Sequence, residues 1–108
     1  MRPIVFIVIS LLGMNAIAKD SRTEILIKSY AYDYQTLIYC STYFEEKGFS
    51  LQIEPATTAA TKALTELWGI GGKNHKKEKE GKKDAATVWV NGGSDKTNLC
   101  LKLMNEWG

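Results

Sequence analysis

The 108-residue sequence has few of the side chains that catalysis and metal binding require. It contains one histidine, His75, and two cysteines, whereas a zinc site needs four ligands. It also has no G-x-S-x-G, H-E-x-x-H or calcium-loop pattern. We therefore expect no cofactor and no metal, and a binding or inhibitory module rather than an enzyme.

A strong excess of charge of one sign is also missing. The chain carries 14 basic and 12 acidic side chains, a formal net charge of +2. Nucleic-acid-binding domains normally carry a pronounced basic excess. The composition therefore predicts that nucleic acid is not a partner.

The sequence has one pronounced apolar run, and that run is short. Residues 4–14 (IVFIVISLLGM) follow Arg2 and precede Ala16-Ile17-Ala18, the order of a secretory signal peptide. A membrane anchor is the alternative, but a spanning helix needs about 20 apolar residues. We expect residues 1–18 to be a cleaved signal peptide. Residues 19–108 would then form a single small helical domain, periplasmic or secreted, with no membrane span after cleavage.

The two cysteines, Cys40 and Cys100, both lie in the expected mature domain. Export would place them in an oxidising compartment, where an even number of cysteines favours an intramolecular disulfide. A redox pair would usually be spaced C-x-x-C, which is absent. The sequence therefore predicts a structural Cys40–Cys100 disulfide, rather than a metal site or a catalytic thiol.

Helical periodicity dominates the first half of the domain. Residues 22–47 repeat apolar positions at three- and four-residue spacing, and Gly48 is a suitable helix stop. Residues 24–28 could alternatively form a strand. Residues 49–54 (FSLQIE) alternate apolar and polar side chains, which indicates a short extended linker. Pro55 would then open a second helix that ends at Gly69. Its expected apolar stripe is Ala56, Ala59, Ala60, Ala63, Leu64, Leu67 and Trp68.

Residues 73–83 (KNHKKEKEGKK) contain six lysines and no large apolar side chain. Such a run is solvated, either as a protruding loop or as the exposed start of a third helix. Residues 84–90 would continue that helix, with a strand as the alternative. The run is either a plain charged surface or a contact surface for a partner. In the second case the candidate contact residues are Lys73, Asn74, His75, Lys76, Lys77 and Lys79.

The last segment is predicted to be a helix capped by Ser94 or Asp95. Cys100, Leu103, Met104 and Trp107 would share its buried face, so that the disulfide clamps this helix onto the first. The expected fold is therefore mainly all-α: a small bundle of three to four helices stapled by one disulfide.

Three segments carry a resemblance to a known family. They are an aromatic and apolar helix with a central cysteine (residues 32–44), an alanine-rich helix (residues 56–68) and a C-terminal helix with Cys-Leu-x-Leu (residues 96–107). In this order they resemble the periplasmic immunity proteins that neutralise amidase effectors of type VI secretion. The family pattern departs from this chain in the lysine-rich middle, where a more regular helix is expected.

The resemblance implies an exported helical inhibitor of a peptidoglycan amidase, with Cys40 and Cys100 as the family's paired cysteines. It also implies a possible homodimer and a loop that blocks the effector's active-site groove. We assign that loop to residues 69–83 as a hypothesis. Two other functions stay open: a periplasmic accessory or structural protein, and an envelope protein that binds an anionic polymer or lipid headgroups through its lysines.

Overall fold

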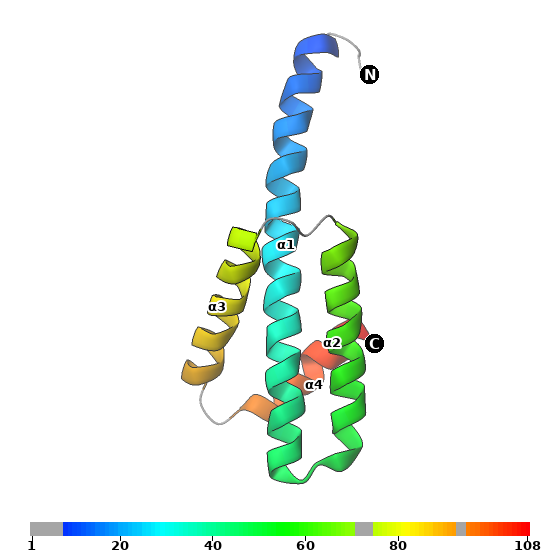
Figure 1. The fold of residues 1–108 in the computed structure, drawn as a ribbon, viewed down its shortest axis with the longest axis vertical. Coiled ribbons are helices and arrows are strands. Elements are labelled where there is room, and N and C mark those ends of the chain that lie inside the picture. The colour runs from blue at the N-terminus through cyan, green and yellow to red at the C-terminus, as the bar shows by residue number, and fades with distance from the viewer. Residues whose placement is uncertain (1–7, 71–74, 93–94) are drawn as a thin grey trace.

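The computed structural model describes residues 8–70, 75–92 and 95–108, with side chains from residue 22 onward except His75. Four helices follow one another in this part of the chain: α1 (Val8–Lys47), α2 (Ser50–Gly69), α3 (His75–Asn91) and α4 (Lys96–Trp107). α1 is the central helix, with α2 and α3 on either side of it, and α4 crosses the bundle (Figure 1). The expected small helical bundle is confirmed.

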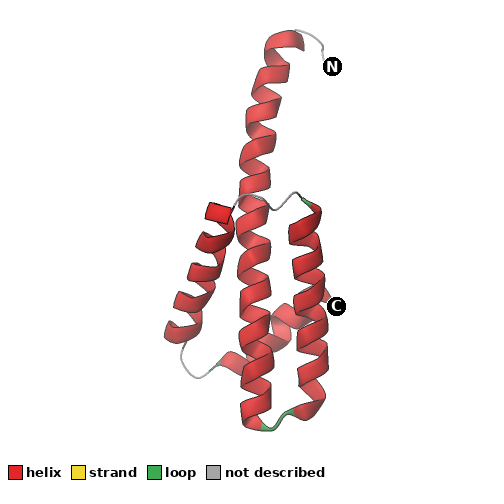
Figure 2. Cartoon of the chain, in the orientation of Figure 1, coloured by secondary structure: helices red, strands yellow, loops and turns green. Residues whose placement is uncertain are grey.

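The described residues are almost entirely helical and contain no strand (Figure 2). Residues 24–28 lie within α1 and residues 84–90 lie within α3. The β-branched and aromatic side chains of these two segments favour strands, but this preference is weaker than the packing of the helices in the folded chain. Both strand alternatives are therefore wrong.

α2 packs on α1 through small side chains. Ala56, Ala59, Ala60, Ala63 and Leu67 are all buried, as the predicted stripe requires. Leu37 of α1 packs into the alanine cluster and is fully buried. Trp68 is the exception to the stripe, because its side chain is 67% exposed.

The expected linker at residues 49–54 is wrong, because α2 already begins at Ser50. An alternation over six residues is too short to separate a strand from a helix. The helical phase places Ile53 one turn before Ala56, and both pack in the cluster around Phe44. Pro55 consequently lies in the second turn of α2 and not, as predicted, in the first. In the second turn, the absence of a proline N–H removes one backbone hydrogen bond of the helix.

α3 approaches α1 closely because it has glycine at the point of contact. A Cβ atom on Gly81 would overlap the carbonyl oxygen of Lys28 and lie 3.0 Å from the Cβ of Ala31. One turn later, Ala85 is buried at 1% exposure. The lysine-rich segment therefore has one face of small side chains that fits α1, and its long charged side chains project elsewhere.

α4 is attached to α1 by a covalent bond and by polar contacts. Cys40 and Cys100 form the predicted disulfide, with Cα atoms 5.7 Å apart and both side chains fully buried. The indole N–H of Trp107 donates to the carboxylate of Asp33 over 3.0 Å. Of the two predicted capping residues of α4, Ser94 lies outside the described residues, and Asp95 occupies the N-cap position but makes no side-chain capping hydrogen bond.

α1 begins within the predicted signal peptide and continues past residue 18. Among the side chains described from residue 22 onward, the first buried one on α1 is Ile27. Cleavage after residue 18 stays a prediction. Across the described residues, no helix combines the length and the apolar character that a membrane crossing requires.

Candidate functional site

The predicted contact residues lie in or near the start of α3. Lys73 and Asn74 fall outside the described residues, and His75 is the first residue of the helix. Lys76 and Lys79 are exposed, whereas Lys77 is half-buried. From His75 onward the segment is a helix docked on α1, so an inserting loop is wrong for residues 75–83, whereas residues 71–74 lie outside the described part of the chain.

Two lysines of this segment, and one lysine of α1 that faces it, have acidic neighbours. Lys77 lies 3.5 Å from Glu80, and Lys82 lies 3.7 Å from Glu78, both along α3. Lys28 of α1 reaches Asp84 over 3.3 Å. Such solvent-accessible pairs contribute little to stability, about 0–1 kcal/mol each, but they reduce the local positive field. The structure thus makes this surface less cationic than its sequence suggests.

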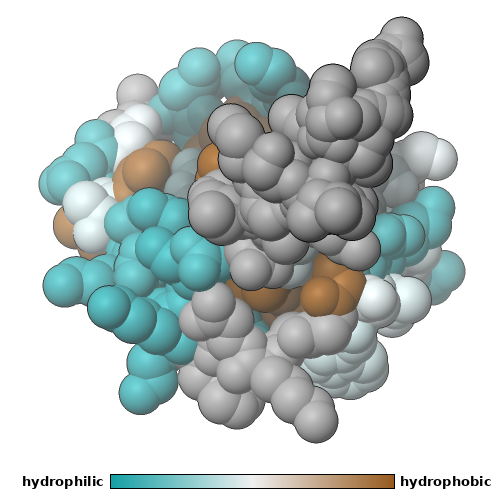
Figure 3. Space-filling model, turned by 90° about the horizontal axis from the view of Figure 1, so that it is seen from above, coloured by the Kyte–Doolittle hydropathy of each residue, from teal (hydrophilic) through white to brown (hydrophobic). Residues whose placement is uncertain are grey.

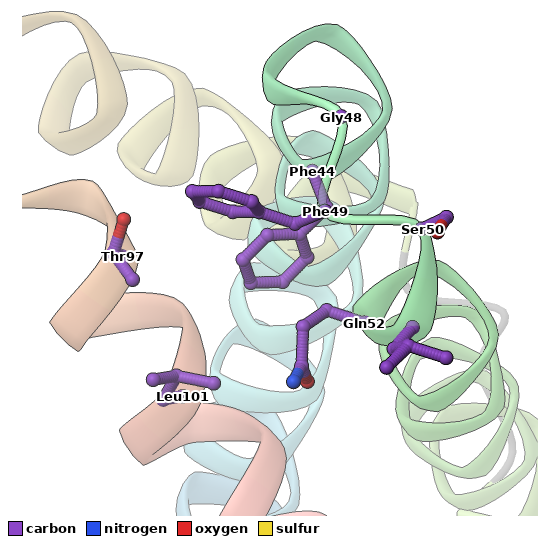
Figure 4. Close-up of a pocket in the computed structure, with 8 residues that line it drawn as sticks. Phe44, Gly48, Phe49, Ser50, Gln52, Thr97 and Leu101 are labelled. Atoms are coloured by element: carbon purple, nitrogen blue, oxygen red, sulfur yellow. The ribbon is translucent and has the colours of Figure 1, made fainter.

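An apolar hollow lies at the end of the bundle where α1 turns into α2. We call it the end hollow; its volume is about 380 Å³, and it is lined by Phe44, Gly48, Phe49, Ser50, Leu51, Gln52, Thr97 and Leu101. The rings of Phe44 and Phe49 stand side by side and face Thr97 and Leu101 of α4 (Figure 4). The hollow therefore brings together three helices and the α1–α2 turn.

Local backbone geometry places Phe49 at the hollow. Gly48 has a φ of +77°, and its N–H donates to the carbonyl of Glu45 over 3.2 Å. The N–H of Phe49 donates to the carbonyl of Phe44 over 2.8 Å. These two bonds form a Schellman motif, whose usual companion is an apolar contact between the same two outer residues. Here that contact joins the rings of Phe44 and Phe49, with centroids 6.2 Å apart.

The other wall of the hollow belongs to α4. Leu101 follows the bridged Cys100 directly and is 41% exposed. The hydroxyl groups of Thr97 and Tyr43 lie 2.8 Å apart, within hydrogen-bonding distance. The disulfide and this contact fix the position of α4 beside Phe44, so the wall is held by α1.

The end hollow is exposed as well as apolar. Leu51 is 87% exposed and Phe49 is 45% exposed, although each belongs to a residue type that is usually buried. None of the eight lining side chains is acidic, basic or otherwise titratable near neutral pH. The hollow therefore suits an apolar side chain of a partner, and it has no group for acid–base chemistry.

The sequence contains a pattern that predicts one wall of the end hollow, but interpreting residues 49–54 as a linker left this pattern unused. Phe44, Gly48 and Phe49 have the spacing of a Schellman motif with its apolar contact. That spacing predicts a helix stop with Phe49 folded back on Phe44. The position of Leu101 in the same hollow could not be predicted in this way, because Leu101 is far from Phe44 and Phe49 in the sequence.

The titratable groups with shifted pKa values lie elsewhere on α1. Burial raises the pKa of Asp33, the hydrogen bond from Trp107 opposes this rise, and the charge of Glu106 adds to it. Burial also raises the pKa of Tyr32, with a further contribution from Asp33. Trp107 itself packs edge-on against Tyr30, with ring centroids 5.6 Å apart. This arrangement attaches α4 to α1.

Within residues 8–70, 75–92 and 95–108, no three histidine, cysteine, aspartate or glutamate side chains cluster closely enough to hold a metal ion. At the end from which the N-terminal half of α1 projects, hydrophilic side chains cover much of the visible surface, with hydrophobic patches between them (Figure 3).

Comparison with known proteins found no matching family model, no similar curated protein and no similar solved structure.

Proposed function

We propose that this chain is an exported, non-enzymatic binding module that recognises a partner protein through the end hollow. The observation that supports this proposal is the exposure of Leu51 and Phe49 around an apolar hollow lacking titratable side chains. Apolar side chains exposed together at a concave surface are typical of protein–protein contact sites. A polypeptide with one projecting apolar side chain fits this chemistry.

The most specific form of the proposal is inhibition of a peptidoglycan amidase, as in the immunity proteins that residues 32–44, 56–68 and 96–107 resemble. The α1–α2 turn is a more suitable blocking element than the lysine-rich segment. It forms one end of the bundle and exposes the apolar side chains of Phe49 and Leu51, whereas α3 is docked along α1 from His75 onward (Figure 1). Burial of Phe49 and Leu51 in an effector groove would stabilise the complex in a largely salt-independent way.

The test compares two exposed apolar positions of similar exposure. Leu51 is 87% exposed at the end hollow, and Val90 is 77% exposed on α3. Full-length tagged chains carrying Leu51→Asp or Val90→Asp are expressed in the native host, and proteins retained at high salt are compared with those of the unaltered chain. We expect one stoichiometric partner, lost with Leu51→Asp and kept with Val90→Asp.

The retained protein is then assayed for cleavage of peptidoglycan amide bonds, with and without the purified chain. Amidase activity that the unaltered chain blocks, and that Leu51→Asp does not, would support the inhibitor function. A partner without amidase activity would overturn the inhibitor function and favour an accessory role. A partner that tolerates Leu51→Asp would overturn the assignment of the end hollow.

A further inference from the structure

A second hollow lies between α1, α3 and α4 and is rich in aromatic side chains. We call it the aromatic groove; its volume is about 430 Å³, and it is lined by Ile38, Tyr39, Thr42, Tyr43, Glu46, Trp89 and Lys96. This volume falls within the range of about 300–1,000 Å³ that is usual for ligand pockets. The aromatic groove is separate from the end hollow, with which it shares none of its lining residues.

Three aromatic rings form the centre of the groove. Tyr39 packs against Trp89 with centroids 5.5 Å apart, and Tyr43 meets Trp89 nearly edge-on over 6.0 Å. All three side chains are partly exposed rather than buried in the core. The hydroxyl of Tyr43 is fixed by its contact with Thr97, so this ring has a defined orientation.

A cation of the chain itself occupies the groove. The Nζ atom of Lys96 lies over the ring of Trp89, 5.0 Å from its centroid. The face of an aromatic ring attracts an ammonium group through its negative potential, and tryptophan does so most strongly. Lys96 is the first residue of α4, so its side chain reaches Trp89 across the short α3–α4 connection.

Glu46 adds a carboxylate to the same lining. A carboxylate beside aromatic faces is complementary to an ammonium group, because it supplies the full negative charge that the rings lack. Displacement of Lys96 would open Trp89 to a flat sugar ring as well, but a sugar has no positive charge to pair with Glu46. The groove therefore suits a cation better than a sugar.

From this geometry we propose that the aromatic groove is a binding site for a lysine side chain of a partner polypeptide, and that Lys96 occupies it in the free protein. Binding displaces the ammonium group of Lys96 from Trp89 and places the incoming ammonium group between the rings and Glu46. Lys96 is thus an internal competitor that lowers the affinity for isolated lysine side chains. This proposal does not depend on the end hollow or on its partner.

The probe is N-acetyl-lysine amide, with N-acetyl-norleucine amide as an uncharged control of similar shape. Binding to the full chain is followed through the indole N–H resonances in NMR spectra, and the Trp89 signal is identified by its loss in Trp89→Phe. We expect the lysine probe to shift the Trp89 signal in a saturable way. The norleucine probe should leave it nearly unchanged.

Variants of the two charged lining residues test the competition. Lys96→Ala should raise the affinity for the lysine probe by about 2- to 5-fold, the range expected from loss of one exposed cation–π contact. Lys96→Arg keeps a cation and should keep the low affinity of the unaltered chain. Glu46→Gln should weaken binding, whereas Lys83→Ala, on the exposed surface of α3, should have no effect.

Three results would overturn the proposal. The first is a Trp89 signal that the lysine probe does not move. The second is an equal shift with lysine and norleucine probes, which would show apolar binding only. The third is an unchanged affinity in Lys96→Ala when the NMR spectrum shows that the variant is folded.

Discussion

The ring of Phe49 folds back onto the ring of Phe44 across Gly48, and their centroids lie 6.2 Å apart. A helix stop thereby becomes one wall of an apolar surface. The left-handed conformation of Gly48 directs Phe49 towards the end of α1, while α2 continues immediately from Ser50. The proposed contact site therefore depends on the backbone of one turn as much as on its apolar side chains.

Gly48→Ala should lower the free energy of unfolding by about 1–2 kcal/mol, because an L-amino acid side chain is strained at a φ of +77°. Urea unfolding followed by circular dichroism measures the change. Gly69→Ala is the matched control, since a Cβ atom there meets nothing within 4 Å and the backbone is not left-handed. An equal effect of the two substitutions would contradict the role assigned to the turn.

Gly81→Ala should also destabilise the chain, although alanine is the better helix former by about 1 kcal/mol. The new Cβ atom would overlap the Lys28 carbonyl, and a backbone atom cannot move aside as a flexible side chain can. We expect a net loss of about 1–3 kcal/mol, the usual range for overpacking. Lys83→Ala on the same helix should change stability by less than about 0.5 kcal/mol. A more stable Gly81→Ala protein would show that α3 does not dock on α1 this closely.

Much of the fold could be predicted from local patterns. The end of the first helix at Gly48 and the alanine stripe of the second follow from helical periodicity and stop signals. The disulfide followed from the number of cysteines and the expected export. These features depend on neighbours in sequence or on a single pairing, so a sequence can specify them.

The candidate sites were less predictable, because they depend on packing between distant segments. The lysines at residues 76–83 were predicted to form a candidate contact surface. In the structure this segment is a helix that packs on α1 through Gly81 and Ala85. The alternation of apolar and polar side chains over residues 49–54 predicted an extended linker. In the structure these residues are helical from Ser50, and Ile53 packs beside Phe44. Sequence patterns do not predict that Tyr39 and Lys96 both lie against Trp89.

Asp33→Asn should make stability less dependent on pH. Burial raises the pKa of Asp33 in the folded chain, so the folded state holds this proton more tightly than the unfolded state does. Stability contributed by protonated Asp33 is therefore full below the ordinary value of 3.8 and is lost as pH rises through the higher folded value. We expect Asp33→Asn to be more stable than the native chain at neutral pH, with the advantage fading in acid.

The measurement is urea unfolding at a series of pH values, read by tryptophan fluorescence. Glu66→Gln, at an exposed position of α2, controls for the loss of one negative charge. The amide that Asp33→Asn introduces keeps an oxygen that can accept the indole N–H of Trp107, so the contact with α4 is retained. A variant that is less stable at neutral pH would show that the carboxylate charge strengthens this hydrogen bond by more than its burial costs.

Removing the disulfide should release α4 before the rest of the bundle. The bridge closes a chain segment with a sequence separation of 60, for which loop entropy gives about 4 kcal/mol of stabilisation. Without it, α4 keeps the Trp107–Asp33 hydrogen bond and the burial of Leu103, whereas α1 and α2 keep their alanine-lined interface. The double variant Cys40→Ala/Cys100→Ala should therefore lose amide-exchange protection first in α4, which includes the Leu101 wall of the end hollow. Reductant should reproduce this pattern in the native chain and leave the double variant unchanged. Equal loss of protection in α2 and α4 would instead show that the helices unfold as one unit.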